Sequence, residues 1–118
     1  MNGAEMIAAE RRRQVDAEGW TPEHDDEHRP GELLDAARSY ELVAAYQFLR
    51  DDPAHADSRL VARALECPPI WPWHASWWKP SDDPVRNLVR AGALIAAEID
   101  RLQRRSEVAD SPSDQVTP

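Results

Sequence analysis

The sequence contains little cysteine, little glycine and no excess of positive charge. It has one cysteine, four glycines and a formal net charge of −8. The single cysteine, Cys67, excludes an internal disulfide and is typical of a reducing cytoplasm. With so few glycines there is no glycine-rich phosphate-binding loop. The negative charge argues against a general nucleic-acid binder, because such proteins attract phosphates with a basic surface.

Long apolar runs are also absent. No run approaches the roughly 20 residues that span a bilayer, and the N-terminus lacks the apolar stretch of a signal peptide. We therefore expect a cytoplasmic protein that makes no membrane contact. Its 118 residues correspond to a single domain.

Alanine and tryptophan are the main residues that the chain has available for a core. Alanine buries little area per residue, so much of the apolar burial must come from the five tryptophans, each of which can bury on the order of 200 Å². A small core of this kind also favours a homo-oligomer, since association buries surface that a monomer leaves exposed.

Caps and apolar periodicity predict helices over residues 4–18, 22–28, 30–50 and 84–105, and a shorter one over 57–66. Gly19 is a plausible helix stop, Thr21 and Pro22 read as a cap and first-turn proline, and Gly92 predicts a close helix crossing. The last helix has a regular apolar stripe that we expect to face the core: Val85, Leu88, Val89, Gly92, Ile95, Ala96, Ile99 and Leu102.

Between the last two helices lies a loop rich in proline and tryptophan. Residues 67–80 hold four prolines and four tryptophans, which forbids a regular helix and predicts an ordered loop wrapped over the helices. We predict an all-α fold, a small three- to four-helix bundle over residues 1–105. Residues 106–118 are polar and acidic, and we expect a disordered tail there.

The bend after the first helix is dense in ionisable groups, with four acids and two histidines over residues 22–28. His24 and His28 are spaced to share one side of a helical turn, whereas the adjacent Asp25 and Asp26 point about 100° apart. We therefore favour the interpretation that both aspartates cap helix ends and that the histidines bond to the tryptophan-rich loop. A divalent metal shared by His24 and His28 is the alternative that this spacing leaves open, but we predict no metal site and no cofactor.

Anion recognition is the second candidate chemistry. One arginine of the run Arg11 to Arg13 could clamp a phosphate, although the run also reads as a solvated face that pairs with Glu10 and Asp16. Most tryptophans should be core, but a few exposed indoles near basic residues could stack a nucleobase. The predicted ligand-binding residues are Arg12, Arg13, Gln14, Trp20, His24, Asp25, Trp78, Lys79 and Arg86, with Trp77 an alternative to Trp78.

Several motifs together resemble a known family. The pattern EGWTPEHDD…WPW…WWKP…LVxAGALIxAEI, over about residues 5–103, looks like a family of small uncharacterised phage and prophage proteins. The resemblance implies a phage or prophage accessory protein in the cytoplasm of a host bacterial cell. The insertion-prone segment 51–65 adds nothing to it.

The chain is also faintly similar to all-α nucleotide pyrophosphohydrolases of the MazG type. That similarity implies magnesium-binding acids on two helices. Here Glu32 is followed by Asp35, Glu98 by Asp100, and position 101 is an arginine, so the spacing departs from the pattern of that family. No serine or cysteine lies in a recognisable nucleophile motif.

From these features we expect a protein that is not an enzyme. The phage resemblance, the aromatic residues and the placed arginines favour an anti-defence sponge, a homo-oligomer that sequesters a small nucleotide immune signal such as a cyclic oligonucleotide or a cyclic ADP-ribose. The alternatives are a MazG-like metal-dependent pyrophosphohydrolase and a protein-binding inhibitor of a host enzyme.

Overall fold

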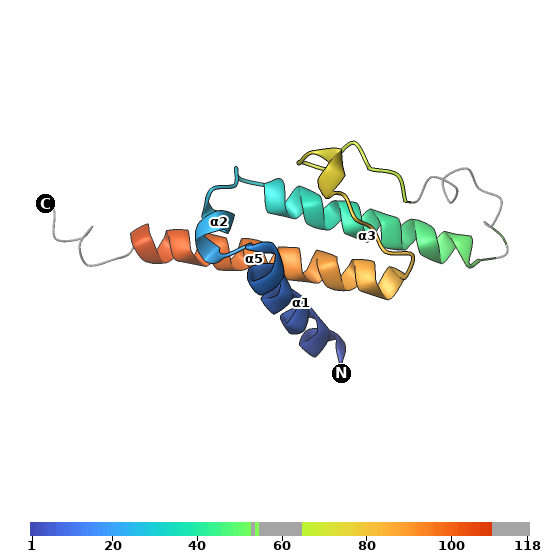
Figure 1. Ribbon diagram of the computed structural model, residues 1–118, viewed down its shortest axis with the longest axis horizontal. Coiled ribbons are helices and arrows are strands. Elements are labelled where there is room, and N and C mark those ends of the chain that lie inside the picture. Colours follow the sequence, from blue (N-terminus) through green and yellow to red (C-terminus); the bar gives the residue numbers. More distant parts are fainter. Residues whose placement is uncertain (53, 55–64, 110–118) are drawn as a thin grey trace, which may run out of the picture.

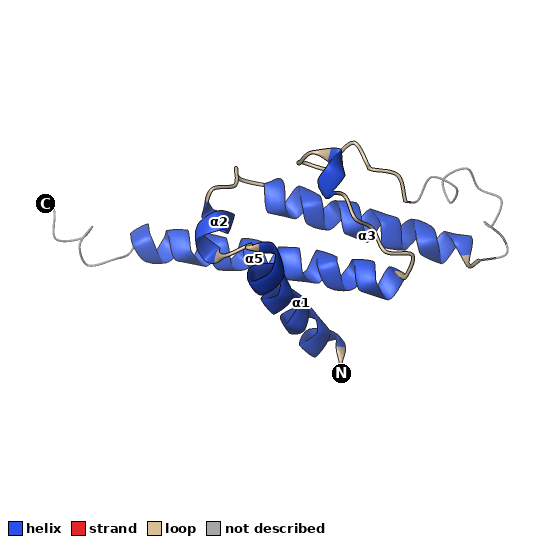
Figure 2. Cartoon of the chain, in the orientation of Figure 1, coloured by secondary structure: helices blue, strands red, loops and turns tan. Residues whose placement is uncertain are grey.

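The computed structural model describes residues 1–52, 54 and 65–109, and these residues form helices and loops without strands (Figure 2). In chain order the elements are α1 (Gly3–Glu18), α2 (Pro22–Asp26), α3 (Glu32–Arg50), the short 3₁₀ turn η1 (Ala75–Trp77) and α5 (Pro84–Ala109). The predicted small all-α bundle is confirmed. The helix predicted over 57–66 falls almost wholly outside the described residues.

Local signals in the sequence set the helix ends. Gly19, with φ of 72°, takes the left-handed conformation that ends α1. The Thr21 hydroxyl accepts a hydrogen bond from the His24 backbone N–H at 3.3 Å and caps α2. Asp83 accepts one from the Val85 N–H at 3.0 Å where α5 starts. The predicted stop of α1 and the predicted starts of α2 and α5 are therefore confirmed, whereas α2 ends at Asp26, before the predicted end at residue 28.

The long helix α5 organises the bundle. It runs antiparallel to α3, and α1 crosses it at a steep angle (Figure 1). A Cβ atom added at Gly92 would lie 2.6 Å from Cδ1 of Ile7 on α1, which is far inside a normal contact. The predicted close crossing at Gly92 is confirmed, because any side chain at this position would have to displace that of Ile7.

The core lies between α3 and α5, and the tryptophan-rich loop covers it. Trp71 is buried and its ring centroid lies 5.7 Å from that of Tyr40 and 5.0 Å from that of Trp78. Edge-to-face ring pairs of this kind stabilise a fold by about 0.5–1.5 kcal/mol each beyond their buried area. The buried core cluster consists of Leu33, Ala36, Ala37, Tyr40, Trp71, Ala91, Leu94 and Ala97.

The buried face of α5 is not the predicted one. Alanines and one leucine, Leu94, face α3, and their small size lets the two helices pack closely. The larger side chains of the predicted stripe are turned away from α3 and are 40–51% exposed: Val85, Leu88, Ile95, Ile99 and Leu102. The expectation that these five residues pack in the core is wrong for the single chain.

A buried polar network ties the end of α3 to the start of α5. The Asn87 side-chain amide donates to Oε1 of Gln47 at 2.9 Å and to the Ser81 carbonyl oxygen at 2.8 Å. Gln47 donates to the same carbonyl at 2.8 Å, and the Ser81 N–H donates to Oδ1 of Asn87 at 2.9 Å. Each partner is thus satisfied, which fixes the loop that brings Lys79 to the bundle.

The C-terminal boundary differs from the predicted one. Helix α5 continues to Ala109, past the expected end of the helical domain at residue 105. The rest of the predicted acidic tail, residues 110–118, lies outside the described residues. Among the helices that the structure describes, none has the length and apolar character needed to cross a membrane.

Candidate functional site

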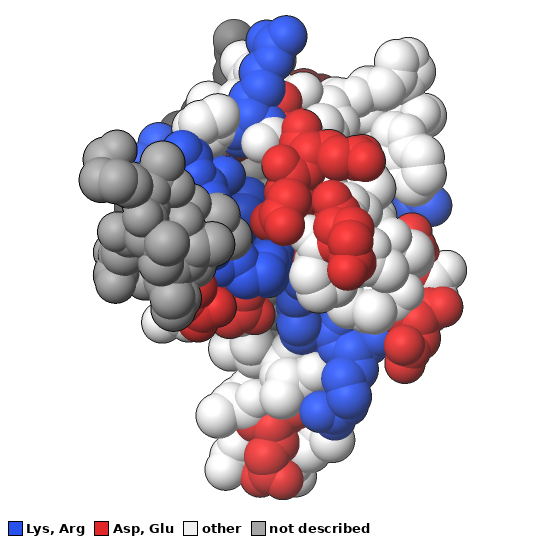
Figure 3. Space-filling view, turned by 90° about the vertical axis from the view of Figure 1, so that its left-hand side faces the viewer, with Lys and Arg blue, Asp and Glu red and all other residues white. Residues whose placement is uncertain are grey.

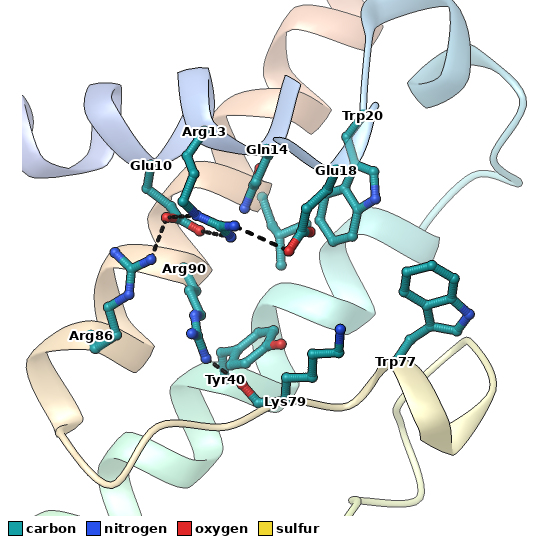
Figure 4. A pocket seen from close by; sticks show the side chains of 11 residues that line it. Glu10, Arg13, Gln14, Glu18, Trp20, Tyr40, Trp77, Lys79, Arg86 and Arg90 are labelled. Carbon is teal, nitrogen blue, oxygen red and sulfur yellow. Dashed lines mark hydrogen bonds and ion pairs between the residues drawn. The ribbon is translucent and has the colours of Figure 1, made fainter. Parts of the chain in front are cut away.

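A cavity of about 140 Å³ opens where α1, α5 and the tryptophan-rich loop meet. We call it the cationic cavity (Figure 4). It is lined by Glu10, Arg13, Gln14, Glu18, Trp20, Tyr40, Trp77, Lys79, Arg86, Arg90 and Leu94.

The lining of the cationic cavity is positive although the protein is acidic. Four basic side chains and two acidic ones line it, which leaves a net charge of +2 in a chain whose net charge is −8. In Figure 4 the residues of α1 lie across the opening from Lys79, while Arg86 and Arg90 reach it from α5. A local positive charge enclosed by protein attracts anions more strongly than the same charge in open water.

Glu10 holds two of the arginines in place. Its carboxylate accepts from Nε and Nη2 of Arg13 at 2.7 and 2.8 Å and from Nη2 of Arg86 at 2.7 Å. Burial alone would raise the pKa of Glu10, but the hydrogen bonds and charges of Arg13 and Arg86 outweigh it and hold the pKa below its ordinary value. Glu10 therefore remains ionised near neutral pH and fixes both guanidinium groups at the cavity wall.

Gln14 lines the same cavity and has an unpaired side-chain acceptor. Its side chain is 2% exposed, and its Oε1 has no hydrogen-bond partner in the described part of the chain. Burying an unpaired carbonyl of this kind costs about 1–3 kcal/mol. Because Gln14 lines the cavity, a ligand N–H or O–H group that enters there could satisfy it.

Aromatic rings and cations are paired around the opening. Nζ of Lys79 lies 5.6 Å from the centroid of the Trp77 ring, and Cζ of Arg90 lies 5.7 Å from that of Tyr40. Arg90 also donates a hydrogen bond to the carbonyl oxygen of Lys79. The Trp77 side chain is 54% exposed, so part of its ring surface is available for stacking.

A second cavity, of about 310 Å³, adjoins the first. We call it the histidine cavity. Trp20 and Trp77 line both cavities. The histidine cavity is lined by Trp20, His24, His28, Trp73, His74 and Trp77.

The two aspartates of α2 do not cap helix ends, and the expectation that they do is wrong. Asp25 is buried and pairs through Oδ2 with Arg11, which also donates to the Trp20 carbonyl oxygen at 3.2 Å. Burial raises the pKa of Asp25, and the charge of Arg11 only partly offsets this. Asp26 pairs with Arg104 of α5 at 2.7 Å, which holds the pKa of Asp26 below its ordinary value.

His28 is held between the start of α3 and the tryptophan-rich loop. Its Nδ1 lies 3.0 Å from Oε2 of Glu32, which also accepts from Nε1 of Trp73 at 3.0 Å. The His28 and Trp73 ring centroids are 5.0 Å apart, and the His24 ring lies 5.0 Å from His28 on its other side. The His28 ring contacts the loop at Trp73, but its hydrogen bond is to Glu32 of α3, and Nδ1 of His24 has no partner in the described residues. The expectation that the histidines bond to the loop is therefore wrong.

Five of the predicted ligand-binding residues line one cavity. These five are Arg13, Gln14, Trp20, Lys79 and Arg86. The other four lie apart from the cationic cavity: His24 lines the histidine cavity, Asp25 is buried beside Arg11, Trp78 packs on the core, and Arg12 is exposed on α1.

Sequence reasoning missed Glu10, Arg90 and Tyr40 as cavity residues. Arg90 lies one helical turn after Arg86, so the spacing alone could have placed both on the same side of α5. Glu10 and Tyr40 carry no comparable signal, because their roles depend on the way α1 crosses the bundle. Of the two candidate indoles, the structure brings Trp77 and not Trp78 to the cavity.

The acids that the hydrolase interpretation needs are engaged elsewhere. Glu98 pairs with Arg101 at 2.6 Å in a buried ion pair, and Glu32 is bonded to His28 and the tryptophan-rich loop. Among the described residues, the one cluster of histidine, cysteine or acidic side chains with metal-ligand proximity is His24, Asp25 and His28, on α2 and the turn after it, and it includes neither of these acids.

Charge on the end of the molecule near α2 is mixed. Figure 3 shows basic and acidic side chains next to one another there, without a continuous acidic surface in that view. The ion pair between Asp26 and Arg104 is one such neighbour pair. This arrangement gives no specific support to an inhibitor that mimics nucleic acid with an acidic face.

Comparison of the chain with protein-family models, with curated proteins and with solved structures finds no match. The site therefore has to be interpreted from its own chemistry.

Proposed function

We propose that this protein is a non-enzymatic, phage-encoded binding protein that captures a small nucleotide signal of bacterial immunity in the host cytoplasm. The observation that supports the proposal most is Gln14, a buried glutamine that lines a cavity with a local charge of +2 and whose Oε1 has no partner in the described residues. A nucleotide offers the three matching groups: an anionic phosphate, a flat base and N–H or O–H donors.

Each group of a nucleotide has a candidate partner in the cationic cavity. Phosphate oxygens would bind Arg86 and Lys79, because charge-assisted hydrogen bonds to such groups are the stronger ones in proteins. A base would stack on the exposed ring of Trp77, an interaction worth about 1–3 kcal/mol per base. Gln14 would accept a hydrogen bond from the base or the ribose.

The size of the cavity limits the bound part. A volume of about 140 Å³ is below the 300–1,000 Å³ of most small-molecule sites. A cyclic oligonucleotide or a cyclic ADP-ribose would therefore place one phosphate and its neighbouring groups there. The remainder would extend past Trp20 and Trp77 into the histidine cavity, which those indoles also line.

We further propose that the protein is a homo-oligomer joined through α5. The exposed apolar residues of α5 recur at intervals of three and four on either side of Gly92, the position where Ile7 of α1 packs. This is the spacing of a seam between two helices. Helix α1 covers the stripe at Gly92, and the apolar residues on either side of that crossing remain exposed. A second copy of the chain offers the same stripe and would cover it.

Binding to a panel of nucleotides tests the proposal directly. Purified protein is titrated with cyclic di- and trinucleotides and with cyclic ADP-ribose by calorimetry, then heated, and the supernatant is analysed for the unchanged ligand. We expect one class of ligand to bind and to be released intact. If none binds at 100 µM protein, a concentration chosen to detect weak sites, the proposal is wrong.

Matched variants locate the site. Lys79→Ala and Arg86→Ala remove a cation from the cationic cavity, whereas Arg12→Ala removes one from the exposed side of α1. We expect the first two to weaken binding about tenfold or more and Arg12→Ala to leave it within about twofold. Equal effects of all three would show non-specific attraction to positive charge.

The same samples address the alternatives. Appearance of a hydrolysed nucleotide that depends on magnesium would support a pyrophosphohydrolase in place of a sponge. Recovery of a stoichiometric host enzyme with the protein, without bound nucleotide, would support an inhibitor.

A further inference from the structure

Three potential metal ligands converge at α2, outside the cationic cavity. His24, Asp25 and His28 each offer one ligand atom, and these atoms lie within 4.8 Å of one another. Zinc bonds of about 2.0–2.1 Å place tetrahedral ligand atoms about 3.3 Å apart. Side-chain rotations that shorten the separations between these atoms by up to about 1.5 Å would therefore let all three bind one ion.

Two of these residues have buried polar atoms without partners. Oδ1 of Asp25 and Nδ1 of His24 have no hydrogen-bond partner in the described residues, and Asp25 is 1% exposed. Arg11 binds the other oxygen of Asp25, so the carboxylate is fixed in orientation while Oδ1 stays unused. A buried carboxylate oxygen and a buried imidazole nitrogen left unpaired at the same place point to a shared cation.

The environment of His28 matches that of a metal-bound histidine. Glu32 is a carboxylate that accepts from Nδ1 of His28, so the proton resides on Nδ1 and Nε2 keeps its lone pair. Metal-ligating histidines commonly hold their second nitrogen in this way. Trp73 donates to the same carboxylate oxygen and fixes Glu32 in turn.

The donor set indicates the class of ion. Two imidazoles and one carboxylate suit a borderline transition metal such as Zn²⁺, whereas Mg²⁺ and Ca²⁺ prefer all-oxygen sites. Asp25 and Glu32 contribute two negative charges and Arg11 one positive charge, so the site keeps a net charge of −1 that attracts a cation.

We propose that His24, Asp25 and His28 bind one divalent transition-metal ion of the Zn²⁺ class, with Glu32 as the positioning residue. Three protein ligands leave one coordination position open. Because both histidines line the histidine cavity, an exogenous ligand or water would approach that position from there. The proposal does not depend on nucleotide binding.

The test uses the full chain with no polyhistidine tag, treated with a chelator and then titrated with Zn²⁺ by calorimetry. We expect one ion per chain with a micromolar or lower Kd, retained through dialysis and counted by elemental analysis. Co²⁺ in the same site should give the intense visible absorption of tetrahedral coordination. No binding at 100 µM Zn²⁺, or displacement of Zn²⁺ by millimolar Mg²⁺, would overturn the proposal.

Variants separate this site from adventitious binding. His24→Gln should weaken Zn²⁺ binding at least 100-fold, and Glu32→Gln should weaken it about 10- to 100-fold. His74→Ala is the control, because His74 lines the same cavity but is bonded to Ser76 at 2.8 Å. It should bind as the unmodified chain does, whereas equal losses for His24→Gln and His74→Ala would overturn the assignment.

The folding of the variants is measured independently. His24→Gln removes a ring whose Nδ1 has no partner, so its metal-free unfolding midpoint should match that of the unmodified chain. All titrations are done without nucleotide, and failure of the proposed nucleotide binding therefore leaves the metal result unaffected.

Discussion

The bundle contains two buried glutamines that differ in whether their amides are satisfied. Gln47 is 0% exposed and uses both ends of its amide, whereas Gln14 is 2% exposed and has an unpaired Oε1. Leucine has a similar volume and removes the polar groups in either case. We predict that Gln47→Leu lowers the free energy of unfolding and that Gln14→Leu leaves it unchanged or raises it.

The magnitudes follow from the bonds. Gln47→Leu loses two buried hydrogen bonds, each with a net worth of about 0.5–1.5 kcal/mol, while Asn87 and Ser81 keep their bonds to each other. The expected loss is about 1–3 kcal/mol. Gln14→Leu removes an acceptor whose unpaired burial costs about 1–3 kcal/mol, so we expect a gain of up to about 2 kcal/mol.

Urea unfolding gives both free energies, and thermal unfolding checks them. For a domain of this size a change of 1 kcal/mol shifts Tm by about 3–6 °C, so a difference of about 1–5 kcal/mol between the two variants corresponds to about 3–30 °C. If the proposed nucleotide binding is found, calorimetric titration should show the reverse order: Gln14→Leu binds about tenfold or more weakly, and Gln47→Leu binds normally.

One result would refute the reasoning. If Gln14→Leu destabilises the chain as much as Gln47→Leu does, Gln14 is satisfied by internal structure and offers no acceptor to a ligand. The cationic cavity would then lose the observation on which its nucleotide assignment depends.

Three further predictions concern stability and assembly. The pKa of Glu10 lies below its ordinary value of 4.5, so the stability it contributes is present above pH 4.5 and is lost as the pH falls through the depressed value. In urea unfolding, the stability difference between the unmodified chain and Glu10→Gln should therefore shrink below about pH 4.5. A difference that stays constant with pH would contradict this. Leu88→Glu and Ile99→Glu alter exposed residues of α5. Light scattering should show each variant as a monomer in place of the proposed oligomer, with helix content by circular dichroism unchanged. An unmodified chain that is already monomeric would disprove the proposed seam. Gly92→Ala should lower the free energy of unfolding by about 1–3 kcal/mol, because the added methyl group crowds Ile7. Adding Ile7→Ala should relieve that crowding. A double-mutant cycle without coupling between the two positions would exclude the close crossing.

The sequence determined the helices and their ends, because those depend on neighbouring residues. A glycine free to take positive φ stops α1, a threonine followed by proline starts α2, and Asp83 caps α5. The prolines between residues 67 and 80 likewise exclude a long helix wherever that segment packs. The all-α class follows from these local rules.

Much of the candidate site was also visible in the sequence, as residue types near one another along the chain. Trp20 lies just after Gly19, which ends the helix that carries Arg13 and Gln14. Lys79 precedes the cap of the last helix, and Arg86 lies in that helix. That these two groups face the same cavity was an expectation that only packing could test, since nothing in the sequence states the angle at which α1 crosses α5.

Tertiary structure decided which side of α5 is buried. Apolar periodicity marks a stripe, but α3 packs where alanines allow close approach, and the larger residues are left exposed. Tertiary structure also decided the partners of Asp25. It is buried beside Arg11, which binds one carboxylate oxygen, and the other oxygen has no hydrogen-bond partner in the described residues. A helix cap depends on the few residues around it, so the sequence predicts it. The burial of a charge depends on segments that meet only in the folded chain.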